Sequence, residues 1–174
     1  KIVISSGVVT TLAGLAGNSG SADGTGTSAR FNQARFLTND GTNLYVGDWN
    51  NHTIRKIVIA TGVVSTFAGL AGNSGTTDGT GTLARFLNPR GITTDGTNLY
   101  VTDQNHTIRK VVISSGVVST FAGSAGNSGS VDGTGNTARF NWPGGITTDG
   151  TNLYVVEGAN HTLRKIVIST GEVT

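Results

Sequence analysis

Apolar and polar residues alternate along this chain in short runs that are typical of β-strands. In the second of three similar stretches, the runs at residues 91–95, 98–103, 106–113 and 117–122 are rich in Val, Ile, Thr, Tyr or Phe, which are the residue types enriched in strands. Short loops that contain Gly separate these runs, as tight antiparallel hairpins require. No segment has a convincing helical period. The pattern therefore predicts an all-β chain built from four-stranded antiparallel sheets.

The third and fourth runs of each stretch carry apolar side chains on both faces of the predicted sheet. Ile108 and Val112 point to one face, whereas Val111 and Ile113 point to the other. A sheet that is apolar on both faces has to be covered on both, and face-to-face stacking of like sheets achieves this. A repeated four-stranded meander of this kind is the unit of a β-propeller blade. A β-solenoid is the alternative, but it favours shorter repeats.

The three stretches are repeats of one another. The phrase NHTIRK stands at residues 51–56 and 105–110 and returns as NHTLRK at residues 160–165. The chain accordingly divides into residues 1–55, 56–109 and 110–164, followed by a fourth start at residues 165–174. Because every unit repeats the same order of runs and loops, we expect residues 1–174 to form a single propeller segment of three blades.

The motifs shared by the units resemble the NHL repeat, which is named after its Asn-His-Leu signature. The resemblance is carried by Asp-Gly-x-Gly, Ala-Arg-Phe, Asn-x-Pro-x-Gly-Ile and Asn-His-x-Ile-Arg-Lys, and it covers nearly the whole chain. The first unit departs from the pattern at Ala34 and Phe36, where the other units have Pro and Gly, so we expect an irregular start to its first strand. The resemblance implies a propeller, commonly a six-bladed one. It implies no single activity, because relatives include extracellular binding modules, RNA-binding modules and a few enzymes.

Three repeats are fewer than the about four to eight blades of complete propellers. An arc of three blades leaves an open apolar face at each end, and large exposed apolar patches are typical of interfaces. We therefore expect either that two copies close a six-bladed ring as a homodimer, or that further blades follow in a longer parent chain. Growth into a larger extracellular polymer is the alternative, and it would make size increase with concentration.

Composition narrows the possible functions. Twelve basic and ten acidic residues leave a net charge of +2, which gives little long-range attraction to nucleic acid or to an anionic membrane. No apolar run is long enough for a membrane span. The absence of cysteine excludes disulfides and thiolate metal sites. The chain also lacks methionine and starts at Lys1 inside a repeat, so we expect a processed product, an excised fragment or the traced part of something longer.

Loops on one side of the predicted disc vary between repeats, whereas those on the other side are constant. The turn DGTN occurs unchanged in all three units, but the residues before the first strand and in the turn between the second and third strands differ. Variable loops on a rigid scaffold are a usual place for recognition, and an exposed Trp can stack on sugars or anchor a protein. The candidate ligand-binding residues are Trp49, Trp142, Arg35, Arg90 and Gln104. The alternative is that the loops drift and that both tryptophans cover loop backbone.

Other polar residues recur at the same place in every unit and are predicted to be structural. They are His52, His106, His161, Asp23, Asp78, Asp132, Arg30, Arg85 and Arg139. Each His is expected to fasten the preceding turn through the acidic residue before it (Asp48, Asp103, Glu157). Each Asp precedes its Arg by seven residues, which predicts a local ion pair with the following Phe as a plug (Phe31, Phe86, Phe140).

No metal, cofactor or catalytic residue is predicted. Histidines on successive blades lie too far apart for the about 2.0–2.1 Å bonds of one zinc site, and a single carboxylate in each Gly-rich loop is too few for calcium. No Ser-His-Asp or paired-carboxylate arrangement stands apart from the repeat. RNA binding has little support because the basic residues are spread evenly.

The sequence favours a non-catalytic propeller that is secreted or displayed on a bacterial surface, and that binds a protein or glycan or assembles with copies of itself. Half of a propeller enzyme of the metal-dependent lyase type is the alternative. Such an enzyme would need a metal and catalytic groups in a central cavity, where the first strands offer mostly Ile and Thr.

Overall fold

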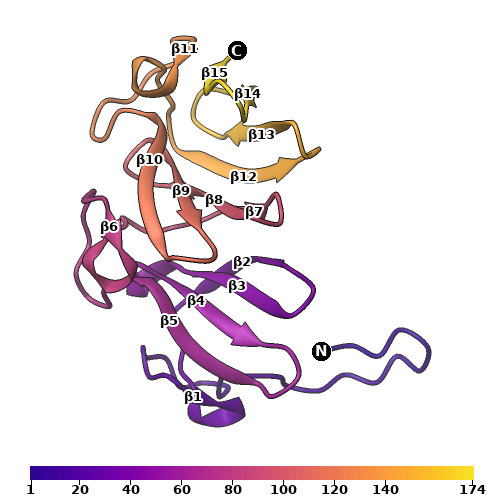
Figure 1. Ribbon diagram of the computed structural model, residues 1–174. Helices are drawn as coiled ribbons and strands as arrows, with labels where there is room; N and C mark the ends of the chain where they lie inside the picture. Colours follow the sequence, from indigo (N-terminus) through magenta and orange to yellow (C-terminus); the bar gives the residue numbers. More distant parts are fainter.

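The computed structural model describes all 174 residues and contains three antiparallel sheets that stack face to face (Figure 1). Sheet 1 has the order β1-β5-β4-β3-β2, sheet 2 the order β6-β10-β9-β8-β7, and sheet 3 the order β11-β15-β14-β13-β12. The strands of sheet 1 are β1 (Gly24–Thr25), β2 (Ala34–Asn39), β3 (Asn43–Asp48), β4 (Thr53–Val58) and β5 (Val63–Gly69). Those of sheet 2 are β6 (Gly79–Thr80), β7 (Ile92–Thr94), β8 (Asn98–Asp103), β9 (Thr107–Val112) and β10 (Val117–Gly123). Those of sheet 3 are β11 (Gly133–Thr134), β12 (Pro143–Thr148), β13 (Asn152–Glu157), β14 (Thr162–Val167) and β15 (Glu172–Val173).

The helical content is limited to four short 3-10 turns. They are η1 (Gly26–Ser28), η2 (Trp49–Asn51), η3 (Gly81–Leu83) and η4 (Gly135–Thr137). None of them has the length or the apolar character that a membrane crossing by a helix would need.

Each sheet is the predicted four-stranded meander with one strand added at its outer edge. The prediction of four strands was therefore short by one. The extra strand is only two residues long and comes from the Gly-rich loop, where Gly79 and Thr80 pair with Val118 and Val117 of β10. Since this loop leaves sheet 1 and pairs with the outer strand of sheet 2 before it enters β7, it ties successive sheets together at the rim.

The turns between the two inner strands of each sheet follow from their sequence. In sheet 2, Asp95 accepts hydrogen bonds from the backbone N–H groups of Thr97 and Asn98 at 2.8 and 2.6 Å, and Gly96 supplies a positive φ of 90°. Such Asx turns favour tight hairpins. Because all three DGTN turns use the same contacts, they form a constant face on one side of the sheets.

The apolar core lies in the seams between sheets. At the first seam, Tyr45, Ile54 and Ala68 of sheet 1 form one cluster with Phe86 and Leu99 of sheet 2, among others. The second seam repeats this cluster with the equivalent residues of sheets 2 and 3. The sheets thus bury both faces by stacking on one another, as their two-sided apolar pattern predicts.

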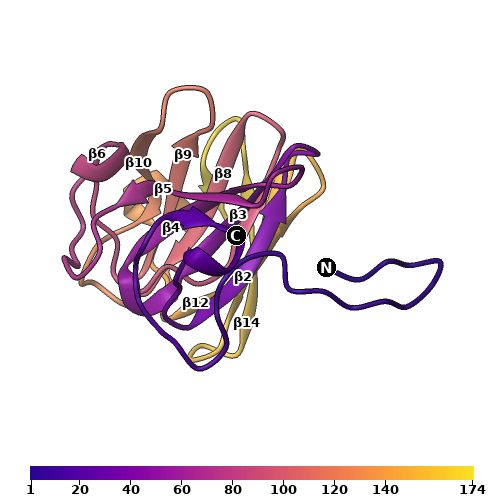
Figure 2. The same ribbon diagram turned by 90° about the horizontal axis from the view of Figure 1, so that it is seen from below.

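The inner strands β2, β7 and β12 lie next to one another along the inner edges of the three sheets. The predicted irregularity of the first unit is not special to it, since β2 has a register shift between Ala34 and Leu37 and β12 has one between Pro143 and Ile146. At the N-terminus, residues 1–10 form a hairpin that is bridged between Ile2 and Val9. This hairpin projects away from the sheets (Figures 1 and 2).

Candidate functional site

The predicted variable face is formed where each Gly-rich loop meets the turn between the two central strands of the same sheet. An acidic side chain in each turn holds the two segments together. Asp48 accepts a hydrogen bond from the Asn32 N–H at 2.7 Å, and Asp103 accepts one from the Leu87 N–H at 2.8 Å. Glu157 accepts a hydrogen bond from the backbone N–H of Asn141 at 2.6 Å. The loop residues that vary between repeats are thereby fixed beside turns that also vary.

The residues that follow these anchors adopt an unusual backbone conformation. Gln33, Asn88 and Trp142 occupy the same place in their repeats and have positive φ angles of 57°, 51° and 53°. Asn tolerates this left-handed region, whereas a bulky residue such as Trp adopts it only at a cost in free energy. Backbone strain of this kind tends to persist at binding and catalytic sites.

Arg35 and Trp49 form the best-defined contact on the variable face. The Arg35 guanidinium lies over the Trp49 ring, 4.2 Å from its centroid, and Nη2 donates to Oε1 of Gln33 at 3.3 Å. Arg35 is exposed and has no carboxylate within ion-pair distance. Next to this pair, the Asn88 side chain donates to the Trp49 carbonyl at 3.1 Å. The ring therefore holds a cation that can still bind a negatively charged partner.

Arg90 occupies the equivalent position on the neighbouring inner edge. Its backbone carbonyl lies against Gly47, where an added Cβ would approach it to 3.1 Å. Its guanidinium extends toward sheet 3, where Gly144 stands in place of a third arginine and an added Cβ would come within 3.5 Å of Nη1. Arg90 has no ion-pair partner, and its buried Nε has no hydrogen-bond acceptor. Two guanidinium groups free of carboxylates thus lie on adjacent inner edges.

Trp142 and Gln104 lie at the second seam, apart from the Arg35–Trp49 pair. The backbone N–H of Trp142 donates to Nδ1 of His106 at 3.3 Å. Gln104 belongs to the same turn as His106. The Trp142 side chain is 52% exposed. No pocket joins the candidate residues, so the variable face is an open surface that presents separate contact points.

His52 and His106 connect neighbouring sheets and do not fasten their own turns through a carboxylate, so that expectation was wrong for these two residues. Nδ1 of His52 accepts a hydrogen bond from the Asn88 N–H at 3.2 Å, across the first seam, as His106 does from Trp142 across the second. All three histidines have a positive φ. Burial lowers the pKa of His52 and that of His106 below the ordinary value, so both rings are neutral acceptors near neutral pH.

The acidic residues of the Gly-rich loops pair with a different arginine from the one predicted. Asp23 binds Arg55 at 2.7 Å, and Asp78 binds Arg109 at 2.7 Å. The predicted partners Arg30, Arg85 and Arg139 donate instead to backbone carbonyls within their own turn. The local pair fails because a fully buried guanidinium on the third strand has a greater need for a carboxylate than an exposed one.

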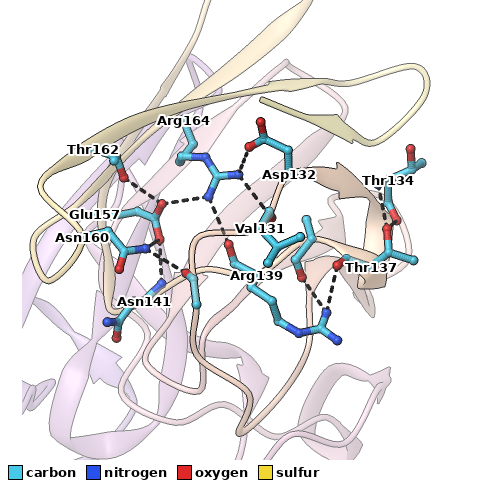
Figure 3. Close-up of polar contacts among 12 residues, drawn as sticks. Val131, Asp132, Thr134, Thr137, Arg139, Asn141, Glu157, Asn160, Thr162 and Arg164 are labelled. Atoms are coloured by element: carbon cyan, nitrogen blue, oxygen red, sulfur yellow. Dashed lines mark hydrogen bonds and ion pairs between the residues drawn. The ribbon is translucent and has the colours of Figure 1, made fainter.

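Each buried arginine holds two carboxylates and lies over a phenylalanine ring. In sheet 3, Arg164 donates to Asp132 at 2.6 Å and to Glu157 at 3.0 Å, and it also binds the carbonyl of Arg139 (Figure 3). Its guanidinium carbon lies 5.4 Å from the centroid of the Phe140 ring. Phe140 is fully buried. The network joins the Gly-rich loop, the central turn and the third strand into one unit.

Burial dominates the electrostatics of these turns. Burial raises the pKa of Asp103 to about 7, against the opposing effects of Arg109 and of the Leu87 N–H group. Burial also raises the pKa of Asp48. On the constant face, burial raises the pKa of Asp95, but hydrogen bonds from Asn98, Thr97 and Tyr100 outweigh it and leave that pKa below its ordinary value. The structure gathers no group of three His, Asp or Glu side chains that could hold a metal ion.

Sequence reasoning missed the buried arginines Arg55, Arg109 and Arg164 as the centres of these networks. A usable signal was present, because Arg109 shares one face of its strand with Thr107 and Val111, and both faces of that strand are covered by neighbouring sheets. A charged residue that recurs at such a position has to be buried, and a buried charge needs partners.

Comparison with known proteins supports this interpretation of the repeats. No protein-family model matches the chain. Over 142 residues, the chain is 31% identical to NHL repeat-containing protein 2 from Bos taurus, which corresponds to 75% of this chain and 20% of that protein. The chain therefore spans about a fifth of the length of the curated relatives it matches.

Solved structures show the same fold. An auxiliary nutrient binding protein from Bacteroides thetaiotaomicron is 29% identical, with a TM-score of 0.68 over 76% of this chain and 36% of that one. A structural genomics protein of unknown function from the same organism is 32% identical, with a TM-score of 0.67 over 72% of this chain and 32% of that one. These similarities establish an all-β, propeller-like arrangement of the sheets.

Proposed function

Because the chain belongs to the NHL-repeat family, whose fold is a β-propeller, we propose that it is a non-catalytic scaffold that binds an acidic protein or glycan on its variable face. The fold and the similarity to a nutrient-binding protein support a binding scaffold in general terms. The chemistry of the variable face supports the more specific proposal that the ligand is an acidic protein or glycan.

The observation that carries the proposal is the exposed cation of Arg35 on the ring of Trp49. All six carboxylates in the Gly-rich loops and central turns already pair with the buried arginines. Arg35 and Arg90 therefore keep an uncompensated positive charge on the variable face. A carboxylate or sulfate group could bind a guanidinium in bidentate fashion while an apolar part of the ligand packs on an aromatic ring.

The shape of the variable face favours an extended ligand. Small-molecule sites are usually concave and enclose most of the ligand, but no pocket is present here. Trp142 offers a second exposed aromatic contact at the next seam. A polysaccharide chain or a protein surface can reach contact points that lie on different sheets, whereas a small molecule would reach one.

We further propose that the chain acts outside the cell and assembles with copies of itself. The abundance of Gly, Thr, Ser and Asn is the composition on which the extracellular setting is proposed. Exposed apolar residues on the end sheets, such as Leu37 at 58% and Leu163 at 66%, support a covering partner, either a further copy of the chain or further blades of a longer parent chain. The same residues favour a structural subunit of a larger polymer as a second candidate, which would show a size that keeps growing with concentration.

A glycan array that contains uronic-acid, sulfated and neutral chains tests the binding proposal. We expect the wild-type chain to retain acidic glycans, and we expect Arg35→Ala, Trp49→Ala and Trp142→Ala to weaken that retention. Lys165→Ala removes an exposed cation elsewhere and serves as the control. Equal retention by all four variants would refute the assigned face.

Elemental analysis of the purified chain tests the non-catalytic proposal, since a stoichiometric bound metal would favour the lyase-type enzyme.

A further inference from the structure

The repeated Asn-His-Thr phrase has the sequence pattern of an acceptor for N-glycosylation. It stands at residues 51–53, 105–107 and 160–162, and no other Asn of the chain has Ser or Thr two positions later. In this modification a sugar is attached to the Asn side chain of the pattern Asn-x-Ser/Thr, where x is any residue except Pro. The pattern ordinarily indicates a surface loop of a secreted protein. The sequence alone would therefore give this chain one acceptor in every repeat.

The structure places the first acceptor inside the network that anchors the variable face. Nδ2 of Asn51 donates to the Gly20 carbonyl at 2.7 Å and to Oδ2 of Asp48 at 2.7 Å. Both hydrogens of this amide are thus used, and Asn51 is only 7% exposed. Because Gly20 lies 31 positions away in the chain, the amide ties the Gly-rich loop to the central turn. The same Asp48 carboxylate binds the buried guanidinium of Arg55.

The second acceptor is buried as deeply as the first. Asn105 is 4% exposed, and its Oδ1 accepts a hydrogen bond from the hydroxyl of Thr107. Thr53 and Thr107, which complete the two patterns, are also buried. An enzyme that reads the pattern has to reach both the Asn and the Thr, and neither is accessible here. In sheet 3, the Asn160 amide likewise donates to a loop carbonyl and to Glu157 (Figure 3).

Attachment of a sugar is incompatible with these contacts. In N-glycosylation the Asn Nδ2 attacks the anomeric carbon of an oligosaccharide that is carried on a lipid diphosphate. A bond forms between Nδ2 and that carbon, and the bond from the carbon to the diphosphate oxygen breaks. The lipid diphosphate leaves, and one Nδ2 proton passes to a base. Since a single hydrogen remains, Asn51 loses one of its two hydrogen bonds, and the sugar has to displace Gly20 or Asp48. Either displacement opens a network that holds buried charges.

We propose that N-glycosylation and folding of this chain exclude each other, because the unfolded chain is an acceptor at Asn51 and Asn105 and the folded chain is not. A chain modified at either residue cannot bring its Gly-rich loop against the central turn. Folded molecules therefore carry no sugar at these two positions. The inference goes beyond the proposed function, since ligand binding has no part in it. It narrows the proposed extracellular setting to an export route that does not glycosylate the unfolded chain.

Production in a eukaryotic host tests the proposal on the full chain, with an export signal placed before Lys1. Thr80→Asn supplies a matched acceptor, because it creates the pattern Asn-Gly-Thr at residues 80–82, where both Thr80 and Thr82 are exposed. Residue 80 is the N-cap of η3, a position that Asn occupies as well as Thr does. The soluble chain with native circular dichroism is separated from the insoluble chain, and sugars are mapped in both fractions by mass spectrometry.

The distribution of sugars between the two fractions decides the outcome. We expect the soluble Thr80→Asn chain to carry sugar at residue 80 and none at Asn51 or Asn105, and the insoluble chain to carry sugar at both. Blocking synthesis of the lipid-linked donor should raise the soluble yield of the wild-type chain. Sugar on Asn51 or Asn105 in natively folded chain would overturn the proposal. So would an unchanged soluble yield, or the absence of sugar at both residues from both fractions, since the unfolded chain would then be no acceptor.

Discussion

The guanidinium of Arg109 donates to the carboxylate of Asp78 at 2.7 Å, although thirty-one positions separate the two residues in the chain. The same side chain binds Asp103 and the backbone carbonyl of Arg85. Arg109 is fully buried, whereas the Asp78 side chain is 51% exposed. One guanidinium therefore fastens the Gly-rich loop, the central turn and the third strand to each other, and the arrangement recurs in all three sheets.

Replacing Arg109 should be severely destabilising. Arg109→Leu leaves the buried carboxylate of Asp103 without its cation, and removal of one partner of a buried ion pair costs about 3–5 kcal/mol. Lys110→Ala, at the next position on the same strand, should change the free energy of unfolding by no more than about 0.5 kcal/mol. Urea unfolding followed by circular dichroism measures both. A loss of less than about 1 kcal/mol for Arg109→Leu would show that the network is dispensable.

The two carboxylates of this network should differ in importance. Asp103→Ala removes a fully buried partner and should cost more than about 2 kcal/mol. Asp78→Ala removes a half-exposed partner and should cost about 1 kcal/mol or less, because water and salt screen such pairs. Unfolding experiments at low and high salt distinguish the two, since only the Asp78 contribution should shrink with salt. The reverse order of losses would contradict the assignment.

Much of the fold was predictable because each repeat states the same pattern. Strands with apolar residues on both faces have to be stacked, and the Gly-containing turns fix the meander. The fifth strand was missed since Gly79 and Thr80 carry no strand pattern and are strand-like only through their pairing with β10. The predicted Asp78–Arg85 pair failed for a related reason, because proximity in sequence says nothing about the buried position of Arg109.

The candidate site was predictable only in part. Variation between repeats located Arg35, Trp49 and Trp142, because the constant scaffold makes differences visible. Their contacts could not be predicted, since they depend on the left-handed backbone at Gln33, Asn88 and Trp142. Nothing in those residue types demands a positive φ, and the conformation follows from the tertiary anchoring of the preceding residue by the acidic side chain of the turn.

Two glycines of sheet 2 and its following loop should respond very differently to the same substitution. An added Cβ at Gly123 would collide with the His106 carbonyl and lie 2.9 Å from the Phe140 ring, at a φ of 89°. At Gly126 the φ is 76°, but nothing lies within 4 Å of an added Cβ. Gly126→Ala should cost about 1 kcal/mol from backbone strain alone. Gly123→Ala should cost at least about 2 kcal/mol more, because the seam has to open to relieve the contact.

Thermal unfolding of the two glycine variants checks this difference. Because both positions have similar backbone conformations, Gly126→Ala controls for strain, and the remaining difference measures packing at the seam. Equal losses in melting temperature for the two variants would mean that the second seam accommodates the added methyl group without a measurable loss of stability.

The histidines should make the seams sensitive to acid. Burial holds the pKa of His106 below its ordinary value, so the unfolded chain takes up this proton at about pH 6.5 and the folded chain only at lower pH. The histidine contribution is therefore complete above about pH 6.5 and is lost as pH falls toward the folded pKa. The loss has a direct cause, since a protonated Nδ1 no longer accepts the Trp142 N–H.

Comparison of variants isolates this contribution from that of Asp103. Burial raises the pKa of Asp103 to about 7, so the folded chain retains that proton and the Asp103 contribution falls as pH rises from about 4 to about 7. His106→Asn and His52→Asn leave the Asp103 contribution in place. Urea unfolding at about pH 5 and about pH 7.5 should show a smaller acid loss for each variant than for the wild type. Identical pH dependence in all three proteins would exclude the histidine mechanism.

Replacing Trp142 should stabilise the fold while it weakens binding. Trp142 has a φ of 53°, and the second repeat places Asn88 at the same position with a φ of 51°. A non-glycine residue in the left-handed region costs about 1–3 kcal/mol, and Asn relieves part of this cost. About half of the Trp142 side chain is exposed (52%), so the apolar burial lost in exchange is limited to the other half. Trp142→Asn should therefore gain about 1 kcal/mol in the free energy of unfolding and lose acidic-glycan retention.

The opposite outcome would be equally informative about the variable face. If Trp142→Asn lost more than about 1 kcal/mol, the indole would be covering loop backbone, and its exposure would have no bearing on recognition. Gln33→Asn, at the same backbone conformation but in sheet 1, controls for the backbone effect without the loss of an aromatic ring. A gain at both positions, combined with loss of glycan retention only for Trp142→Asn, would show that the strained tryptophan is held in place for binding.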